Sequence, residues 1–522
     1  MSRHWSQFSH VMVVGTEPSA PPPATRSLQR PPRRLLTAVL ILCCLGFAGQ
    51  GLTTAYSYWS DEIWSVAASS ADWGMLFRDW LLPDTHPPLY QVLLKLWIGV
   101  FGGGETATRS LSFLIAALGL GAAALGSSGR GSGRRLATVA FLGTSPSFLF
   151  YAQEARSYAL SLALSTLMLG TALLLRQRTG RHEAALRWGF RLACVLLSLT
   201  HYFSLLFVLV VLAVSAADGR VLRRRREAAV LGLLLLLPPL THGLVSPVGA
   251  KFERIDWIEV EPIIGTLMQF SRGLLPLLDL HQGQLAQLGL IGLAVGIGCA
   301  FGSWRNLRRF LVEPTHQLPQ ALGEARYLLL VIGLFLALML VIDPIRPISQ
   351  ARYTIVVLPA VAYLVGTGWE LAAGLGRFRR SSLAVLLVAV LLLQLQIGQR
   401  MLADKRAPLE NYRGMAAFVN STGLCEGGCW STGWRPDALM GTYFRPGQLR
   451  DLEERDPADP MPLRQPLLAF HGNREQMKEL SGTNPQLACW EAPGAWPAKS
   501  FILLPHTSPA QPARHGLRPC PP

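Results

Sequence analysis

Residues 35–64 of the chain are LLTAVLILCCLGFAGQGLTTAYSYWSDEIW, an uncharged apolar run followed by aromatic residues and two adjacent carboxylates. As a helix, the run Leu35–Leu52 is long enough to cross the roughly 30 Å hydrocarbon core of a bilayer. A soluble core needs no series of such runs, so their recurrence predicts an all-α polytopic membrane protein. The other runs are Tyr158–Leu175, Ala228–Leu244, Leu285–Phe301, Tyr327–Ile342, Tyr353–Leu371 and Ser382–Ile397.

The composition supports the same class. Of the 522 residues, 50% are hydrophobic and 15% are charged, whereas a soluble domain carries about 25% charged residues. The mean hydropathy is +0.31. The formal net charge of +16 lies mostly in short arginine clusters between the apolar runs, which is the pattern of cytoplasmic loops in membrane proteins. We therefore expect no nucleic-acid partner.

The arginine clusters predict the sidedness of each loop. By the positive-inside rule, five clusters should face the cytoplasm. The Pro-rich, basic residues 1–34 should form a disordered cytoplasmic tail. The five clusters are Arg130/Arg134/Arg135, Arg176/Arg178/Arg181/Arg187, Arg220 with Arg223–Arg226, Arg305/Arg308/Arg309 and Arg377/Arg379/Arg380.

One apolar segment, Leu89–Phe101, is too short to span and carries Lys95 in its middle. If it spanned, the Arg130 cluster would lie outside, so we expect an interfacial helix on the outer face. The chain then has about eleven crossings, which form a transmembrane catalytic domain over residues 35–399 with a long first outer loop. Residues 400–522 should form a small extracytoplasmic α/β domain. Because the cytoplasmic loops are small, the chemistry should occur at the outer face.

Four of the eight cysteines lie in the C-terminal region, where an oxidising compartment would permit two disulfides. They are Cys425, Cys429, Cys489 and Cys520. The other four, Cys43, Cys44, Cys194 and Cys299, fall inside apolar runs and are expected to pack as small hydrophobic residues.

The candidate site residues lie in the loops expected outside. Asp61 and Glu62 follow the first span, and adjacent helical residues point about 100° apart, so one acid can face a site while the other faces elsewhere. An alternative is that both are solvated acids favoured at a helix start. Glu154 and Arg156 are costly at membrane depth unless they are paired or face a wet cavity. Arg352 either snorkels to the interface or grips a phosphate with its planar guanidinium.

These residues follow an order that resembles bacterial glycosyltransferases of the GT-C fold, among them the protein O-mannosyltransferases and the aminoarabinose transferases that modify lipid A. The likeness covers roughly residues 35–400 and does not extend to the C-terminal domain. The stretches that carry it are Asp61-Glu62, His86-Pro87-Pro88-Leu89-Tyr90, Gly104-Glu105 with Arg109, Leu111 and Ser112, Gln153-Glu154-Ala155-Arg156 with Tyr158, His201-Tyr202-Phe203 and Arg352-Tyr353.

The resemblance implies transfer of a sugar from a polyprenyl-phosphate carrier to a glycan, lipid or protein acceptor, usually with inversion. The expected location is the cytoplasmic (inner) membrane, with the active site facing outside or the periplasm. The expected catalytic acids are Asp61, Glu62 and Glu154. Some relatives carry an aspartate near the position of Glu154. The donor phosphate should contact Arg352, Tyr353, Arg156 and Lys95, and the substrates should contact His86, Tyr158, His201 and Tyr202.

Two features are left open by the sequence. Relatives differ in metal dependence, and a divalent cation such as Mg²⁺ or Mn²⁺ would be held by Asp61, Glu154 or His86. The alternative functions are a transporter or flippase of a lipid-linked sugar and a non-catalytic assembly subunit. Transporters often carry internal repeats with broken helices near mid-bilayer. No such repeat is found here, and the polar residues gather at the outer face, which favours an enzyme.

Overall fold

The structure is a computed structural model of the whole chain. It describes residues 33–522 apart from 54–55, 85, 129–130, 178–181, 223, 246–260, 275–307, 309, 311, 314–317, 373–375, 407–409, 433–435, 453–465, 473–476, 478–481, 483–485, 494–498, 507–510 and 521–522. The expected tail over residues 1–32 and the expected span Leu285–Phe301 therefore lie outside the described residues.

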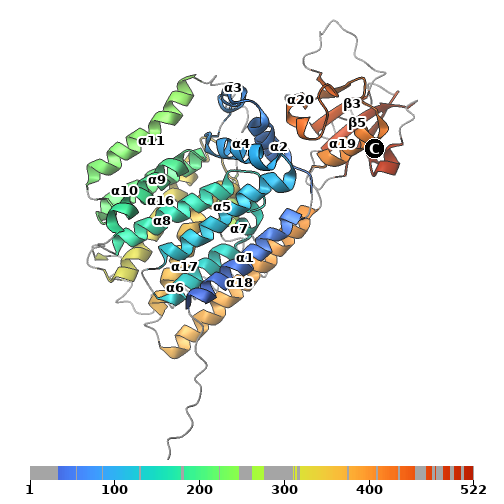
Figure 1. Cartoon of the computed structure of the whole chain (residues 1–522). Helices are drawn as coiled ribbons and strands as arrows, with labels where there is room; N and C mark the ends of the chain where they lie inside the picture. Colours follow the sequence, from blue (N-terminus) through green and yellow to red (C-terminus); the bar gives the residue numbers. More distant parts are fainter. Residues whose placement is uncertain are drawn as a thin grey trace, which may run out of the picture.

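A bundle of long apolar helices forms most of the molecule (Figure 1). Six described segments are long and apolar enough to cross a membrane, which agrees with the predicted multi-pass class. The count of about eleven crossings stays a prediction. The six segments are α1 (Arg33–Thr53), α5 (Glu105–Gly126), α8 (Tyr158–Arg176), α16 (Gln320–Ile342), the 3₁₀ turn η5 (Ala351–Val357) with α17 (Leu358–Ala372), and α18 (Arg377–Arg406).

Shorter helices complete the bundle. Pro146 lacks an N–H group, so it is suited to the first turn of a helix and separates α6 from α7. At the end of the bundle next to the C-terminal domain lie α2, α3 and α4 (Figure 1). The shorter helices are α2 (Ser60–Ser70), α3 (Trp73–Met75), η1 (Leu76–Leu81), α4 (Leu89–Phe101), α6 (Ser132–Thr144), α7 (Pro146–Tyr151), α9 (Glu183–Ser198), α10 (Tyr202–Asp218), α11 (Arg225–Val245) and α13 (Ile263–Leu274).

Small residues bring α5 and α8 close together. A Cβ atom added at Gly119 would lie 3.2 Å from Ala163, and one added at Gly126 would lie 2.6 Å from the Cα atom of Gly170. The Tyr363 hydroxyl of α17 covers Gly126 and Gly170. Close backbone approach through small residues is how membrane helices pack, because lipid supplies little hydrophobic drive between helices. This seam holds α8 against α5.

Buried ion pairs lie at the end of the bundle away from α2. Arg134 of α6 contacts Glu324 of α16 at 2.6 Å and Glu370 of α17 at 2.9 Å, and its side chain is fully buried. Arg176, at the end of α8, pairs with Asp218 at the end of α10. Two arginines of the clusters that predict topology therefore also tie helices together, since a buried guanidinium requires a partner.

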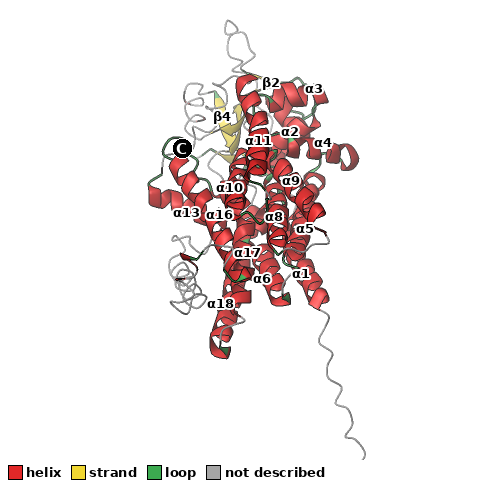
Figure 2. Ribbon diagram, turned by 90° about the vertical axis from the view of Figure 1, so that its left-hand side faces the viewer, coloured by secondary structure: helices red, strands yellow, loops and turns green. Residues whose placement is uncertain are grey.

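The C-terminal region forms a mixed sheet with helices, in agreement with the expected small α/β domain (Figure 2). The strand order is β2-β1-β3-β5-β4-β6. Strand β1 pairs in parallel with β2 and β3, and the β3–β5, β5–β4 and β4–β6 pairs are antiparallel. The elements are α19 (Tyr412–Thr422), β1 (Cys429–Thr432), α20 (Pro436–Leu439), η6 (Met440–Thr442), β2 (Leu449–Asp451), β3 (Leu467–Gly472), β4 (Leu487–Glu491), β5 (Lys499–Pro505), η7 (Pro512–His515) and β6 (Arg518–Pro519).

All four C-terminal cysteines form disulfides, as expected. Cys425 pairs with Cys429 and Cys489 pairs with Cys520. The second bridge links β4 to the residue that follows β6. A domain of this size gains stability from such links because they restrict the unfolded chain.

Candidate active site

The carboxylate of Asp61 lies between two guanidinium groups. Asp61 is in the first turn of α2. Its Oδ2 atom lies 3.1 Å from Nη1 of Arg352 and 3.6 Å from Nη2 of Arg156. The Asp61 side chain is 29% exposed, against 16% for Arg352 and 8% for Arg156. The acid is therefore the most accessible member of the cluster and can meet a ligand.

The two arginines come from separate elements. Arg352 lies in η5, which opens the span that continues as α17. Arg156 lies in the turn between α7 and α8, where its Nη1 atom donates to the carbonyl of Asp61 at 3.2 Å and to Oγ of Ser65 at 3.0 Å. With two cations facing one carboxylate, the cluster has a net positive charge, which suits an anionic ligand such as a phosphate.

Two opposing effects set the pKa of Asp61. Burial raises the pKa of its carboxyl, but the charges of Arg156, Arg352 and His86 outweigh burial and hold the pKa below its usual value. Asp61 is therefore ionised at neutral pH.

Glu62 points to a different partner from its neighbour. It is fully buried and accepts two hydrogen bonds from Arg109 of α5, at 2.8 and 2.6 Å. It also accepts the backbone N–H of Ala155 at 2.9 Å. The acid that sequence analysis grouped with Asp61 thus joins α2 to α5 and to the loop before α8. This buried, bidentate ion pair links the helices, and its carboxylate is not exposed to a substrate.

Glu154 is also fully buried, one residue before Ala155. Its charge raises the pKa of the Tyr151 hydroxyl, after the larger effect of burial. Among the described residues, the ion pairs of Asp61 are with Arg352 and Arg156. The fully buried Glu154 therefore lies near Tyr151, and its catalytic role stays a prediction.

Histidine and aromatic rings form a wall beside the cluster. His86 Nδ1 lies 3.1 Å from the buried Asp84, and its Nε2 lies 3.5 Å from Arg156 Nη2. The His86 ring meets that of His201 edge-on at 4.9 Å, and His201 lies 5.5 Å from Tyr353. Burial, together with His86 and the arginines, holds the pKa of His201 well below its usual value. His201 is therefore neutral.

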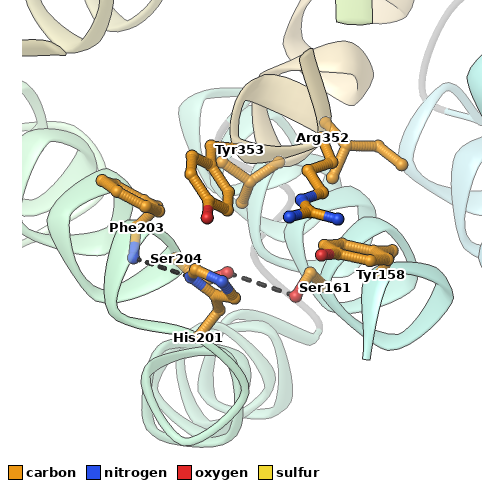
Figure 3. A pocket seen from close by; sticks show the side chains of 9 residues that line it. Tyr158, Ser161, His201, Phe203, Ser204, Arg352 and Tyr353 are labelled. Atoms are coloured by element: carbon orange, nitrogen blue, oxygen red, sulfur yellow. Dashed lines mark hydrogen bonds between the residues drawn. The ribbon is translucent and has the colours of Figure 1, made fainter. Parts of the chain in front are cut away.

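A small pocket opens between these rings, as Figure 3 shows. The pocket is small and partly open to solvent. Arg352 reaches it from η5, next to the side chains of Tyr158 and Tyr353. The lining residues are Tyr158, Ser161, His201, Phe203, Ser204, Arg352, Tyr353, Ile355 and Val356. Arg352, Tyr353, Tyr158 and His201 are thus brought together, as the sequence analysis expected of site residues.

Two predicted site residues lie elsewhere. Lys95 of α4 donates to the carbonyl of Ala71 and lies 5.1 Å from the centre of the Trp73 ring. The hydroxyl of Tyr202 bonds to Nδ1 of His242 at 2.6 Å. These contacts hold Lys95 against the α2–α3 connection and Tyr202 against α11, so neither side chain joins the Asp61 cluster.

Several residues of the site were not predicted. Phe203 packs on Tyr353 with ring centres 4.5 Å apart. The sequence feature that could have identified Phe203 as a site residue is its position directly after His201-Tyr202. Ser161 lies one helical turn after Tyr158, so the two share a face. Ser65, which accepts from Arg156, also lies one turn from Asp61. Helical spacing could have identified Ser161 and Ser65 only after Tyr158 and Asp61 had been assigned to the site.

Two of the residues named for a metal, Asp61 and His86, have other partners in this structure. A divalent cation needs free carboxylate oxygens, yet the Asp61 carboxylate already faces two guanidinium groups that would repel a cation. His86 is turned toward Asp84 and Arg156. Within the described part of the chain, no group of three or more His, Cys, Asp or Glu side chains is arranged to hold a metal ion.

Comparison with known proteins identifies the fold. No protein-family model matches the chain, and no curated protein matches it. The chain is similar to the structure of ArnT from Cupriavidus metallidurans bound to undecaprenyl phosphate, with a TM-score of 0.53 and 12% identity over 90% of this chain and 97% of ArnT. The apo state of the same ArnT gives a TM-score of 0.50 and 13% identity over 90% of this chain and 98% of ArnT.

A further match is the archaeal oligosaccharyltransferase AglB from Archaeoglobus fulgidus in complex with an inhibitory peptide and a dolichol-phosphate. Its TM-score is 0.45, with 10% identity over 91% of this chain and 75% of AglB. ArnT is an aminoarabinose transferase. Because its sequence is only 12–13% identical to this chain, the similarity shows a shared fold and not a shared activity. The GT-C fold expected from the sequence is confirmed.

Proposed function

We propose that the chain is a membrane glycosyltransferase that moves a sugar from a polyprenyl-phosphate donor to an acceptor at the outer face of the cytoplasmic membrane. The observation that carries the proposal is the partly exposed Asp61 carboxylate between Arg352 and Arg156. It lies at one end of a bundle that has the fold of ArnT. The likeness to ArnT in complex with undecaprenyl phosphate supports a lipid phosphate as the anion.

In this reaction the arginines bind the donor phosphate. Arg352, at the start of a span, would contact a phosphate whose lipid tail lies among the helices. The bond between the sugar and the phosphate then breaks with its electron pair on the phosphate oxygen. The guanidinium groups stabilise the charge that develops there. Arg352 lies beside Tyr158, His201 and Tyr353, whose side chains would contact the sugar at the mouth of this small pocket.

Asp61 is the proposed general base. It accepts the proton of the acceptor hydroxyl or amine while the acceptor oxygen or nitrogen forms the new bond to the sugar, opposite the departing phosphate. Binding of the donor also prepares this step. A phosphate that draws the guanidinium groups toward itself weakens their hold on Asp61, so the pKa of Asp61 rises toward a value suited to a base.

The test uses purified protein in detergent with a polyprenyl-phosphate sugar and a lysate of the native cell envelope as the source of acceptors. Release of free polyprenyl phosphate is measured for wild type and for Asp61→Asn. Loss of a general base costs about 10²–10⁴ in rate, and we expect that loss in the folded variant. Detergent removes the two compartments, so a transporter would release nothing. Binding without any cleavage by wild type would favour the transporter alternative.

A further inference from the structure

The C-terminal domain holds the start of the helix that carries Asp61. Glu410 lies between α18 and α19 and is fully buried. Its Oε2 atom accepts the backbone N–H of Ser60 at 2.6 Å and the hydroxyl of Tyr412 at 2.6 Å. Ser60 is the first residue of α2, so Glu410 acts at the position directly before Asp61.

This contact replaces a cap that α2 lacks. The first N–H groups of a helix have no partner within the helix and are usually bound by a side chain at the N-cap. The N-cap residue here is Trp59, which makes no side-chain cap. A carboxylate at this position is further favoured by the positive end of the helix dipole. Glu410, 350 residues further along the chain, supplies both the hydrogen-bond acceptor and the negative charge.

Two other contacts secure the adjacent segment. The Tyr443 hydroxyl accepts the backbone N–H of Tyr58 at 2.8 Å and donates to Glu105 of α5 at 2.5 Å. Arg413 pairs with the same Glu105 at 2.7 Å. The C-terminal domain therefore contacts both the start of α2 and the start of α5.

We infer that Glu410 is a positioning residue for Asp61, an inference that rests on the proposed role of Asp61 as the base. The buried Glu62–Arg109 pair already fastens α2 to the bundle, so the helix forms without Glu410. Glu410 sets the position of its first turn, and with it the direction from which Asp61 meets the acceptor. The donor-site arginines lie outside α2, Arg352 in η5 and Arg156 in the turn before α8, so Glu410 does not fix their own backbone positions.

The inference predicts a separation of kcat from KM. In Glu410→Ala the Ser60 N–H loses its partner, and misplacement of a reacting group by about 1 Å can cost on the order of 10²-fold in rate. We expect kcat to fall by roughly 10- to 100-fold while the KM for the donor stays within about threefold. Glu410→Gln keeps an oxygen acceptor and should retain most of the turnover. Glu426→Ala removes an exposed glutamate of the same domain and is the matched control.

The experiment measures polyprenyl phosphate release together with hydrogen exchange of the peptide that contains Ser60. Faster exchange in Glu410→Ala, but not in Glu426→Ala, accompanied by a fall in kcat that Glu410→Gln rescues, would support the inference. Turnover of Glu410→Ala equal to that of Glu426→Ala, or an equal loss in Glu410→Gln, would overturn it. If wild type releases no polyprenyl phosphate, the proposed function fails, whereas unchanged exchange at Ser60 in Glu410→Ala refutes the positioning contact itself.

Discussion

Two substitutions of Arg352 distinguish the effect of its charge from the effect of its planar shape at the proposed phosphate site. Its Nη1 atom lies 3.1 Å from Asp61, and the side chain is 16% exposed. Truncating one partner of a buried, hydrogen-bonded charge pair costs about 2–5 kcal/mol, or roughly 30- to 5,000-fold. Because Arg352 is partly exposed and Arg156 remains as a second cation, we expect Arg352→Ala to lower kcat/KM by about 30- to 500-fold. Arg352→Lys keeps the charge but loses the planar fork, so donor binding should weaken moderately and turnover should fall much further.

The same substitutions predict a pH effect with a definite sign. Asp61 must be ionised to accept a proton, and its pKa lies below the usual value because Arg156, Arg352 and His86 outweigh burial. In wild type the fall of kcat/KM with acid should therefore occur below about pH 4, the ordinary pKa of an aspartate. Removing Arg352 leaves burial less opposed, so in Arg352→Ala the pKa of Asp61 rises and the acid limb moves to higher pH. Arg352→Lys should leave the limb near its wild-type position.

The assay is release of free polyprenyl phosphate by purified protein in detergent, followed over pH at limiting donor. Donor binding is measured separately so that ground-state contacts can be told from contacts that strengthen as the bond breaks. An Arg352→Ala protein with wild-type kcat/KM and an unmoved acid limb would refute the binding of the donor phosphate by Arg352.

Two other predictions concern the scaffold and the topology. Removing one partner of a buried ion pair costs about 3–5 kcal/mol, so Glu62→Gln should lower the melting temperature in detergent more than Asp61→Asn, yet its folded fraction should turn over. A Glu62→Gln protein that melts like wild type but is inactive would instead assign Glu62 to the chemistry. Reporter fusions after Arg135 should be cytoplasmic and fusions after Gln399 external, and an external Arg135 would mean that Leu89–Phe101 spans.

The general architecture could be predicted because its signals are local. The run Leu35–Leu52 predicted a span, and α1 (Arg33–Thr53) covers it. The rise in Pro, Gly and charge after Gln399 predicted a separate domain, and a small mixed sheet is found there. The 100° step of a helix also allowed Asp61 and Glu62 to face different ways, although both were expected to be catalytic acids.

What each acid faces was decided by the tertiary structure. Glu62 meets Arg109, 47 residues away, and Asp61 meets Arg352, 291 residues away. No local pattern says which acid of the pair receives which arginine. Lys95 is a second example of a contact that the sequence does not reveal. Its charge suggested a phosphate contact, but in the structure its ammonium group donates to the carbonyl of Ala71.

The sequence by itself thus determined the membrane class, the position of the C-terminal sheet domain along the chain and the set of polar residues from which a site can be built. Apolar length, charge clusters and motif order are properties of neighbouring residues and need no fold to be detected. Only the tertiary structure decided that Asp61 lies between Arg352 and Arg156, that Glu62 is a buried anchor, and that Glu410 holds the start of α2. Those contacts join segments far apart in the chain, and they exist only because the packed helices bury charges that must each find a partner.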